Sequence, residues 1–437
     1  MGSPNVSLRK DSSILIIGAG TFGISTAYHL VQRGYSDITC IDRHPWPSVD
    51  SAGHDLNKIV RTEYDESMYT ELALQALDVW RKPEWNGIFH ETGRLSTTSG
   101  DALAEQHLRE SFANLQKAGQ GDKVKLVQGR DQIVSHVPQL QNAPDLEKWN
   151  GLFNSIGGWV HSRKALEKWA AEAERLGAKF ISGSRGTMTG LQVNSEGELL
   201  GIRVASGDVL CADQYILSTG AASPQVVPEL SQQLWSKCWT LAHIELTEEE
   251  IIQWKGVPVI DHFELGFMFE PDPETHRIKI CDNNPGYQYQ MGTFTDDSTK
   301  TATRYSIPRY ASAHPRDGIP AEAKAAINRF IDAIMPQFSG RPLVDAKVCW
   351  CTDSPDGHWL IDRHPQHKSL LLATGDSGHA FKMFPIIGGY IADALEGRPG
   401  GLRKEWRYGG RDAKVVSTRP TSQVKDLRDV LTLQAKM

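Results

Sequence analysis

The sequence feature that most constrains the fold is a glycine-rich turn, G-A-G-T-F-G, at residues 18–23. It follows Ile14 to Ile17, an apolar β-branched run typical of a strand buried on both faces of a parallel sheet. The first glycine permits a tight turn, the second lets a pyrophosphate approach the backbone, and the third lets a helix pack on the strand. The helix N-terminus adds oriented N–H donors. The turn therefore predicts a dinucleotide-binding α/β unit.

A helix, a second strand and an acid complete this unit. Residues 24–31 have helical apolar spacing, and Gly34 is expected to end the helix. Residues 38–41 then form a second strand that ends at Asp42, whose carboxylate can bind a ribose diol. The motif alone does not separate NAD from FAD.

Composition limits what such a chain can be. With 437 residues we expect two domains, and no apolar run approaches the roughly 18 residues of a membrane span. The formal charge of −6, without a basic stripe, gives no reason to expect a nucleic-acid partner. Six cysteines in so long a chain do not form a disulfide framework, which favours a reducing compartment.

Two distant segments repeat the pattern of strand, small-residue turn and helix. The first, "DQYILSTGAASPQVV" at 213–227, contains Gly220 in a turn that can approach a dinucleotide closely. The second is "SLLLATGDSGHAFKMFPIIGGYIADAL" at 369–395. Together with the N-terminal motif they predict one FAD-binding domain interrupted by insertions. We assign residues 1–90, 150–225 and 340–437 to this domain, and residues 91–149 and 226–339 to a substrate domain.

The insertions differ in character from the nucleotide-binding segments. Residues 91–149 are polar and mostly helical in pattern, with "DALAEQHLRESFANLQKAG" as the clearest amphipathic run, and are expected to face solvent. "CWTLAHIELT" and "RIKIC" are typical of antiparallel strands, and "PAEAKAAINRFIDAIM" of a helix. The polar tail after about Arg411 is expected to be loosely ordered.

Three further motifs carry a specific resemblance. They are "SAGHDLNKIVRTEY" at 51–64, "CWCTDSPDGHWLIDRHP" at 349–365 and "ATGDSGHAFK" at 373–382. In this order they resemble the fructosyl amino acid oxidases, or amadoriases, which belong to the larger family of monomeric sarcosine oxidase. The similarity extends from residue 13 to about residue 410. It implies an α/β fold, α+β overall, with a Rossmann-like FAD-binding domain of the glutathione reductase or D-amino acid oxidase type and a mixed-sheet substrate domain.

The resemblance also implies an 8α-S-cysteinyl FAD. Cys349 opens the C-x-x-T run in which sarcosine oxidase carries its attached cysteine, because Thr352 follows at that spacing. Cys351 shares the same strand face if the segment is regular, so adjacency alone does not exclude it. A metal site at this C-x-C pair is not expected, because no second cysteine pair or histidine cluster stands at ligand spacing.

Five more residues receive roles through the resemblance. Lys58 is placed over the flavin ring, where a fixed cation stabilises negative charge on the reduced flavin. Arg61 and Lys382 match the pair that clamps a substrate carboxylate. The arginine offers two parallel N–H donors, and the lysine offers a point charge. Lys279, a candidate catalytic residue, and Asn283, a candidate substrate-binding residue, match a substrate-facing loop; some relatives carry an acid where Asn283 stands.

The implied reaction is oxidation of the secondary amine of an Amadori product, giving glucosone, free amino acid and hydrogen peroxide, with oxygen as acceptor. Asp376 is a candidate catalytic residue that engages the amine or the sugar hydroxyls, or else is an acid that caps a turn or helix. His379 is expected to be structural or flavin-adjacent. The expected FAD contacts are Gly18, Gly20, Thr21, Phe22, Gly23, Asp42, Arg43, Ser51, Ala52, Lys58, Gly220, Cys349, Asp376, Gly378 and Lys382.

Two other functions compete with this interpretation. An oxidase of N-methyl or cyclic amino acids has the same fold, flavin link and carboxylate clamp, whereas a redox-silent nucleotide-binding protein releases no peroxide with any amine. The chain is expected to act as a monomer, without a nucleic-acid or membrane partner. Its last residues, Ala435-Lys436-Met437, have the form of a peroxisomal tripeptide, so we expect a peroxisomal or a cytoplasmic location.

Overall fold

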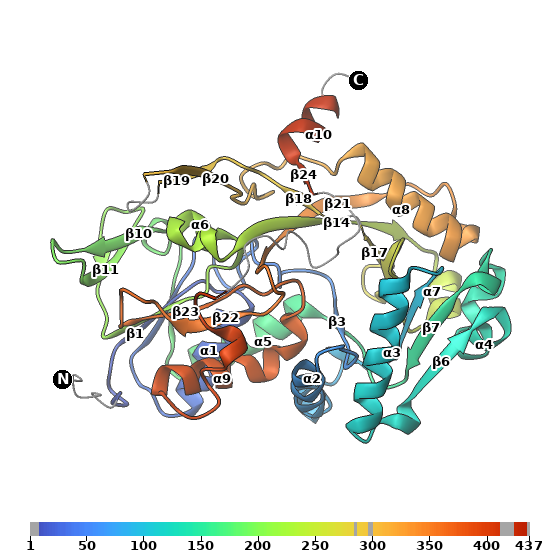
Figure 1. The fold of residues 1–437 in the computed structure, drawn as a ribbon, viewed down its shortest axis with the longest axis horizontal. Helices are drawn as coiled ribbons and strands as arrows, with labels where there is room; N and C mark the ends of the chain where they lie inside the picture. The colour runs from blue at the N-terminus through green and yellow to red at the C-terminus, as the bar shows by residue number, and fades with distance from the viewer. Residues whose placement is uncertain (1–7, 284–285, 296–299, 411–423, 435–437) are drawn as a thin grey trace.

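The computed structural model of the chain describes residues 8–283, 286–295, 300–410 and 424–434. Two large sheets organise it, and Figure 1 shows the long strand β14 (Trp235–Glu245), which belongs to the second of them. One sheet lies with helices α1, α5 and α9, and the other lies with α3, α4, α7 and α8.

The first sheet has six strands in the order β22-β23-β13-β1-β2-β9. It is parallel except for the β22–β23 pair. All four residues of β1 are buried, as expected for a strand covered on both faces. The strands are β1 (Ile14–Ile17), β2 (Ile38–Ile41), β9 (Lys179–Ile181), β13 (Gln214–Leu217), β22 (Leu360–Arg363) and β23 (Leu370–Thr374). The predicted strands at 14–17 and 38–41 are confirmed.

Helices pack on one face of this sheet, and a small sheet packs on the other. The helices are α1 (Thr21–Gln32), α5 (Ser162–Arg175) and α9 (Phe384–Glu396), with α2 (Ser67–Trp80) beside α9. The opposite face is covered by β10 (Met188–Val193), β11 (Leu199–Val204), β12 (Val209–Leu210) and α6 (Ser223–Val226). Gly34 has a φ of +83° directly after α1 and its C-cap residue, so the predicted end of that helix is confirmed.

The second sheet has ten strands. Its order is β24-β18-β14-β17-β16-β15-β5-β7-β6, and β21 pairs with β14. Besides β14 the strands are β5 (Arg94–Thr98), β6 (Val124–Gln128), β7 (Asn150–Asn154), β15 (Val259–His262), β16 (Gly266–Met268), β17 (Arg277–Asp282), β18 (Tyr287–Gln288), β21 (Val344–Asp353) and β24 (Lys425–Asp426). The antiparallel pairing of β14 with β17 confirms the strands predicted from "CWTLAHIELT" and "RIKIC".

Four more helices and two further small sheets belong to the described structure. The helices are α3 (Ala102–Lys117), α4 (Gly129–His136), α7 (Glu248–Trp254) and α8 (Ala321–Ile334). The first small sheet joins β3 (Lys58–Val60), β8 (Gly158–Val160) and β4 (Phe89–His90), and the second joins β19 (Gly292–Thr295) and β20 (Ala302–Tyr305). The helices predicted from "DALAEQHLRESFANLQKAG" and "PAEAKAAINRFIDAIM" are confirmed as α3 and α8.

The prediction that residues 91–149 merely face solvent is wrong. Strand β5, within this range, pairs with β15 on one side and with β7 on the other. Leu95 on β5 is fully buried in the core of the second sheet. Polar residues at Arg94, Ser96 and Thr98 concealed this strand, because both of its faces are buried, one of them is polar, and the usual apolar alternation is missing.

The prediction of a loosely ordered tail is also wrong for residues 424–434. Strand β24 pairs in parallel with β18, and α10 (Leu427–Gln434) follows it. Leu427 is 2% exposed and belongs to the core of the ten-stranded sheet. The tripeptide Ala435-Lys436-Met437 lies outside the described residues, so its predicted role stays a prediction.

The assignment of domain boundaries stays a prediction as well. Strands β7 and β21 fall in ranges that we assigned to the FAD-binding domain, yet both pair within the ten-stranded sheet.

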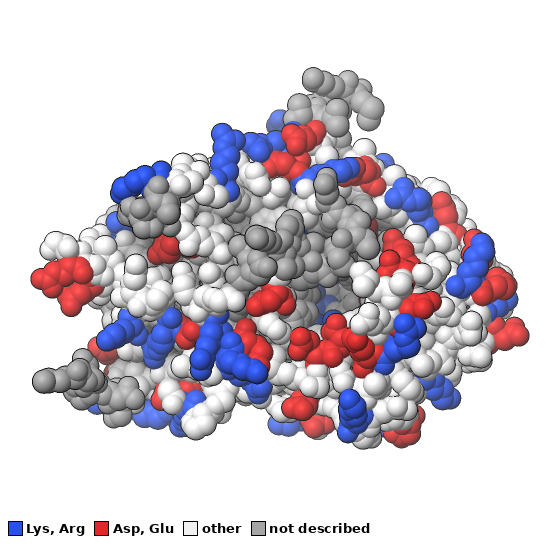
Figure 2. Space-filling model, in the orientation of Figure 1, with Lys and Arg blue, Asp and Glu red and all other residues white. Residues whose placement is uncertain are grey.

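Within the described residues, no helix combines the length and apolar character needed to cross a membrane. Acidic and basic side chains are interspersed on the face shown in Figure 2.

Candidate active site

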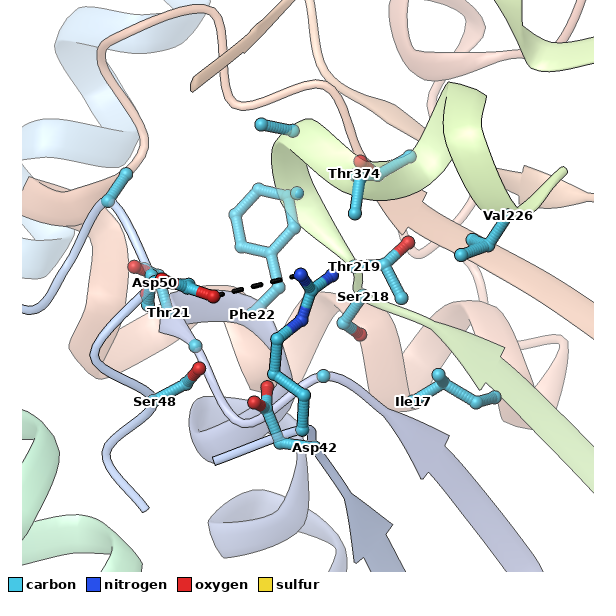
Figure 3. Close-up of a pocket in the computed structure, with 18 of the residues that line it drawn as sticks. Ile17, Thr21, Phe22, Asp42, Ser48, Asp50, Ser218, Thr219, Val226 and Thr374 are labelled. Atoms are coloured by element: carbon cyan, nitrogen blue, oxygen red, sulfur yellow. Dashed lines mark ion pairs between the residues drawn. The ribbon is translucent and has the colours of Figure 1, made fainter. Parts of the chain in front are cut away.

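A pocket lies where the three predicted nucleotide-binding segments meet. The glycine turn contributes Gly18, Gly20, Thr21 and Phe22, the turn after β13 contributes residues 218–222, and the turn after β23 contributes residues 373–376. Figure 3 shows Thr21, Phe22, Thr219 and Thr374 around this pocket. Residues that are about 350 positions apart in the chain therefore build one site.

The glycine turn fits a pyrophosphate. Gly20 is the N-cap of α1 and brings no side-chain acceptor to the helix, so the N–H groups of the first turn face the pocket without a cap. A Cβ on Gly20 would lie 2.7 Å from Ser51 Oγ, and a Cβ on Gly23 would lie 1.8 Å from the Gly18 carbonyl oxygen. Gly18 has a φ of +110°, which L side chains rarely adopt. The positive φ of Gly18 and the lack of room for a Cβ on Gly23 fit the turn and the helix packing predicted for them, and the phosphate contact of Gly20 stays a prediction.

The acid at the end of β2 reaches this pocket. One Asp42 oxygen accepts from the Ala19 N–H at 2.9 Å, and the other accepts from the His44 N–H at 3.0 Å. These bonds hold the carboxylate at the edge of the pocket, beside Ser48 in Figure 3. Its neighbour Arg43 pairs with Asp50 at 3.7 Å, the dashed contact in that figure.

Several pocket residues were not predicted from the sequence. Asp50 lies on the irregular segment before Ser51, and residues 186–188 enter from β10 and the turn before it. Tyr310 comes from the predicted substrate domain, and the Arg43 guanidinium lies 4.9 Å from its ring centroid. None of these residues belongs to a recognisable motif, because each reaches the pocket through the tertiary fold alone.

The predicted FAD contacts fall into two groups. Ten of them line the pocket: Gly18, Gly20, Thr21, Phe22, Asp42, Arg43, Ser51, Ala52, Gly220 and Asp376. The other five are not among its lining residues: Gly23, Lys58, Cys349, Gly378 and Lys382. Gly23 packs against the Gly18 carbonyl oxygen, and Cys349 is the chain neighbour of the pocket residue Trp350.

The two cysteines of the C-x-C pair lie on one strand, β21, but in different surroundings. Cys349 is partly exposed, and its Sγ lies 3.9 Å from Lys58 Nζ and 3.9 Å from the Ala52 carbonyl oxygen. Cys351 is buried and lines the pocket, while its Sγ accepts from Trp239 Nε1 at 3.2 Å. Burial, aided by Asp353, raises the pKa of Cys351 well above its usual value, which disfavours its reactive thiolate.

Beside Cys349, two lysines share one buried carboxylate. Asp55 accepts from Lys58 Nζ at 2.8 Å and also from Lys279 Nζ, and Lys279 donates to the Asn57 carbonyl oxygen at 2.9 Å. Burial alone would raise the pKa of Asp55, but the two ammonium groups outweigh it and hold the pKa well below its usual range. Burial would likewise lower the pKa of Lys58, but Asp55 raises it above its ordinary value. One carboxylate for two ammonium groups leaves this cluster net positive.

Arg61 and Lys382, the predicted carboxylate clamp, converge on one aromatic ring. The Arg61 guanidinium lies 4.0 Å from the centroid of the Tyr64 ring, and Lys382 Nζ lies 5.6 Å from the same centroid. Arg61 also donates to the Glu63 carbonyl oxygen. The tertiary fold thus brings together two basic side chains that are separated by 321 positions.

Behind Arg61 lies an ionic network that sequence reasoning missed. Arg94 on β5 is 3% exposed and donates to Glu63 at 3.2 Å and to Asp261 on β15. Glu63 also accepts from the Thr62 N–H at 2.7 Å. Burial would raise the pKa of Glu63, but Arg94 and Arg61 lower it, so this carboxylate is ionised. No local signal marks Arg94, since its partners come from distant parts of the chain.

Asp376, Asn283 and His379 lie around these clusters. One Asp376 oxygen accepts from the Thr352 N–H at 2.8 Å, and burial raises the pKa of Asp376 to about 6. Asn283 follows β17, and its side chain donates to the His262 carbonyl oxygen at 2.9 Å. His379 contacts the Tyr64 hydroxyl at 3.2 Å and the Gly357 carbonyl oxygen at 2.9 Å, which suits a structural role. No cluster of metal-ligand side chains occurs in the described ranges.

Comparison with known proteins agrees with this geometry. The family model described as "FAD dependent oxidoreductase" matches residues 13–394. L-saccharopine oxidase of Schizosaccharomyces pombe is 33% identical over 405 residues, which are 90% of this chain and 92% of that protein. Monomeric sarcosine oxidase of Arthrobacter sp. is 26% identical over 395 residues, 88% of this chain and 92% of that protein.

The fold also matches solved structures along nearly its whole length. The structure of fructosyl peptide oxidase from E. terrenum has a TM-score of 0.88 and 34% identity, and the match covers 97% of this chain and 98% of that one. The resemblance stated from the motifs and the predicted fold class are therefore confirmed. With its nucleotide pocket, its glycine turn and the family match over residues 13–394, the chain belongs to the family of FAD-dependent oxidoreductases.

Proposed function

We propose that the protein is an oxidase of fructosyl amino acids, which it cleaves oxidatively to glucosone, free amino acid and hydrogen peroxide. One observation carries this choice of substrate class, the near-complete structural match to fructosyl peptide oxidase at a TM-score of 0.88. The clamp of Arg61 and Lys382 supports it, because an α-fructosyl amino acid carries a carboxylate near its secondary amine.

FAD fits the pocket through the hydrogen-bonding groups that the pocket supplies. The uncapped start of α1 suits the pyrophosphate, and Asp42 suits the ribose diol. When bound, the flavin accepts a hydride from the carbon next to the amine and passes the electrons to oxygen. The chain itself binds the substrate, fixes its orientation and sets the charge around the reacting atoms.

Cys349 is the proposed site of covalent attachment. Its thiol is partly exposed, and its Sγ lies 3.9 Å from Lys58 Nζ. Cys351 is buried, accepts a hydrogen bond from Trp239 and has a raised pKa. Although Cys351 lines the nucleotide pocket and Cys349 does not, the chemical environment favours Cys349.

The net positive cluster of Asp55, Lys58 and Lys279 has an electrostatic role in this proposal. A fixed excess positive charge stabilises negative charge that develops on neighbouring groups during the reaction. Asp376 lines the pocket with one oxygen held by Thr352, so its other oxygen is available to a substrate amine or hydroxyl.

A second candidate is oxidation of another N-substituted amino acid. The relative from S. pombe, at 33% identity, acts on L-saccharopine, which is also a secondary amine with carboxylates. Sarcosine is an N-methyl amino acid of the same kind. The clamp serves these substrates equally, so it does not separate the two candidates.

A peroxide assay with a substrate panel tests the proposal. The panel contains fructosyl glycine, ε-fructosyl lysine, a glycated dipeptide, L-saccharopine, sarcosine and pipecolate, each under air and under nitrogen. We expect peroxide from at least one fructosyl substrate at a higher kcat/KM than from any other. Preference for L-saccharopine or sarcosine would establish the second candidate, and no peroxide from any amine would contradict both.

The remaining features of the proposal concern the whole protein. We propose that it acts as a monomer, with oxygen as its second substrate. The C-terminal tripeptide supports import into peroxisomes, with the cytoplasm as the alternative location. Imaging a fluorescent fusion with and without the last three residues tests the location, since a diffuse signal from both would contradict import.

A further inference from the structure

Lys382 is a buried lysine that forms no ion pair with a carboxylate of the described residues. Its residue is 5% exposed, and its Nζ donates to the His379 carbonyl oxygen at 2.8 Å. Among the described residues, no carboxylate oxygen lies within 4.0 Å of this nitrogen. The charges with the largest effect on it are those of Arg61 and Arg94, which carry the same sign as a protonated lysine.

Such surroundings favour the neutral amine. Burial penalises an ammonium group that has no counter-ion, and neighbouring positive charges add to the penalty. An arginine cannot relieve the repulsion by losing its proton, so the lysine must. Burial, then Arg61 and Arg94, lower the pKa of Lys382 well below its usual value, and the opposing effects of Glu63 and Asp376 are smaller. The ionisable groups around Lys382 are Lys58, Arg61, Glu63, Tyr64, Tyr69, Arg94, Asp261, His358, Asp376 and His379.

The charges around Lys382 indicate when this side chain becomes protonated. With neutral Lys382, the guanidinium groups of Arg61 and Arg94 balance the carboxylates of Glu63 and Asp261. A substrate carboxylate that binds at the clamp adds one negative charge to this buried cluster. A proton on Lys382 restores the balance and turns a neutral hydrogen-bond donor into a charged one, which holds the carboxylate more strongly.

The substrate itself carries a suitable proton. An amino acid whose nitrogen bears one alkyl group is an ammonium ion near neutral pH, and this nitrogen must lose a proton before its neighbouring C–H bond can be oxidised. In an α-amino acid only one carbon separates the nitrogen from the carboxyl group. A lysine that binds the carboxylate is therefore close to the ammonium group.

We propose that Lys382 is neutral in the substrate-free enzyme and takes up the proton of the substrate ammonium group as it binds the substrate carboxylate. An N–H bond of the substrate breaks, an N–H bond forms at Nζ, and the electron pair stays on the substrate nitrogen. Nothing is oxidised or reduced in this step. The proposal rests on the proposed function, since it assumes a substrate with both a carboxylate and an amine.

Proton counting during ligand binding tests the first half of the proposal. The probes are acetate and the thioether analogue of fructosyl glycine, which carry a carboxylate but no amine. Isothermal titration calorimetry of the FAD-loaded enzyme in buffers of different ionisation enthalpy measures the protons taken from solution. Near pH 7.5 we expect an uptake of about one proton per site. The Lys382→Arg variant should bind the probes with almost no uptake, because arginine stays protonated. Asp376→Asn, the control for the nearby carboxyl group whose pKa is raised, should keep the uptake.

The pH dependence of flavin reduction tests the second half. Lys382→Arg retains a cation for the carboxylate but has no base for the ammonium proton. In anaerobic stopped-flow mixing with fructosyl glycine at pH 7, we expect reduction to be about tenfold or more slower than in the wild type. The difference should shrink as the pH rises and the substrate loses its proton to the solvent.

Three results would overturn the proposal. They are binding of the probes to the wild type without proton uptake, an unchanged uptake in Lys382→Arg, and no binding of either carboxylate. If Lys382→Arg does not fold, Lys382→Met replaces it in the proton count, and uptake equal to that of the wild type would again overturn the proposal. The proposed function fails separately, when the wild type releases no peroxide from a fructosyl amino acid.

Discussion

Asp55 pairs with both Lys58 and Lys279. Removing each of the three side chains would therefore leave a different set of buried charges. Without Lys58, the carboxylate and Lys279 remain as a matched pair that is almost completely buried. Without Asp55, two ammonium groups lose their shared partner, and burial then opposes both charges. Lys58 is therefore the side chain of this cluster whose removal tests the excess charge with least damage to the fold.

We expect Lys58→Met to slow flavin reduction, its reoxidation by oxygen, or both, because the cation acts on charge that develops during these steps. Substrate affinity should change comparatively little. Anaerobic stopped-flow mixing with fructosyl glycine measures reduction, and mixing the reduced enzyme with oxygen measures reoxidation. Both rates must be normalised to bound FAD, since Lys58 also lies beside Cys349. If both then equal the wild-type rates, Lys58 has no role in the chemistry.

The two cysteines of β21 provide a matched pair of variants. We expect Cys349→Ala to abolish the yellow colour that stays with acid-precipitated protein, because no thiol then remains beside Lys58. Cys351→Ala should keep the colour, since its sulfur is buried against Trp239. Absorbance of the redissolved precipitate measures the retained flavin. Loss of colour in Cys351→Ala alone would move the attachment to that residue.

Arg61 provides a further test of the clamp. Replacing it with Met removes one charged hydrogen bond to the carboxylate, which costs roughly 1.5–3 kcal/mol, or about tenfold or more in affinity. We expect KM for fructosyl glycine to rise accordingly and KM for fructosyl methylamine, which has no carboxylate, to change much less. Steady-state peroxide assays measure both. An equal loss on both substrates would exclude a carboxylate clamp at Arg61.

At the scale of elements, the contact between α1 and α9 is unusually close. The Gly388 N–H donates to Ser25 Oγ at 2.9 Å, and this hydroxyl donates to the Phe384 carbonyl oxygen at 2.6 Å. A Cβ on Gly388 would lie 2.1 Å from the Ser25 carbonyl oxygen, whereas a Cβ on Gly389 would meet the His29 ring at an ordinary 3.5 Å. The helix that starts at the nucleotide pocket is therefore held in place by a glycine near the other end of the chain.

Neighbouring glycines on α9 give a controlled test of this contact. We expect Gly388→Ala to destabilise the protein by about 1–3 kcal/mol through overpacking, and to weaken FAD binding because α1 must shift. Gly389→Ala should be neutral or slightly stabilising, since alanine favours a helix by about 0.5–1 kcal/mol over glycine. Thermal denaturation and the FAD content of the purified variants measure both effects. Equal melting temperatures would contradict the close packing of α1 on α9.

At the scale of the whole molecule, the sequence predicted local units better than distant contacts. The strand at 14–17, the helix that follows it and the acid at position 42 were predictable, because hydrophobic period and glycine chemistry act over a few residues. The contacts of Arg94 with Glu63 and Asp261 were not, since they depend on how β5 lies beside β15. Arg61 and Lys382 were paired only through the resemblance.

The tail shows the same limit, because its polar composition predicted little order. One apolar residue, Leu427, docks the tail: it is 2% exposed and lies in the core of the ten-stranded sheet. Leu427→Ala should cost about 2–5 kcal/mol, enough to release β24 and α10 from the edge strand β18. Limited proteolysis followed by mass spectrometry should then show faster cleavage near the C-terminus. Asp429→Ala, at an exposed position on the same helix, is the control. Equal cleavage rates in the two variants would contradict a docked tail.

The pocket has a consequence for the order of events during synthesis. Its lining begins at Ile17 and is complete only with Asp376, so no early portion of the nascent chain contains a finished site. The glycine turn leaves the ribosome long before the turns that follow β13 and β23. Capture of FAD must therefore wait until most of the 437 residues have been made. Until then the apolar strand β1 lacks its neighbour β13, and an unpaired apolar strand edge is prone to aggregation.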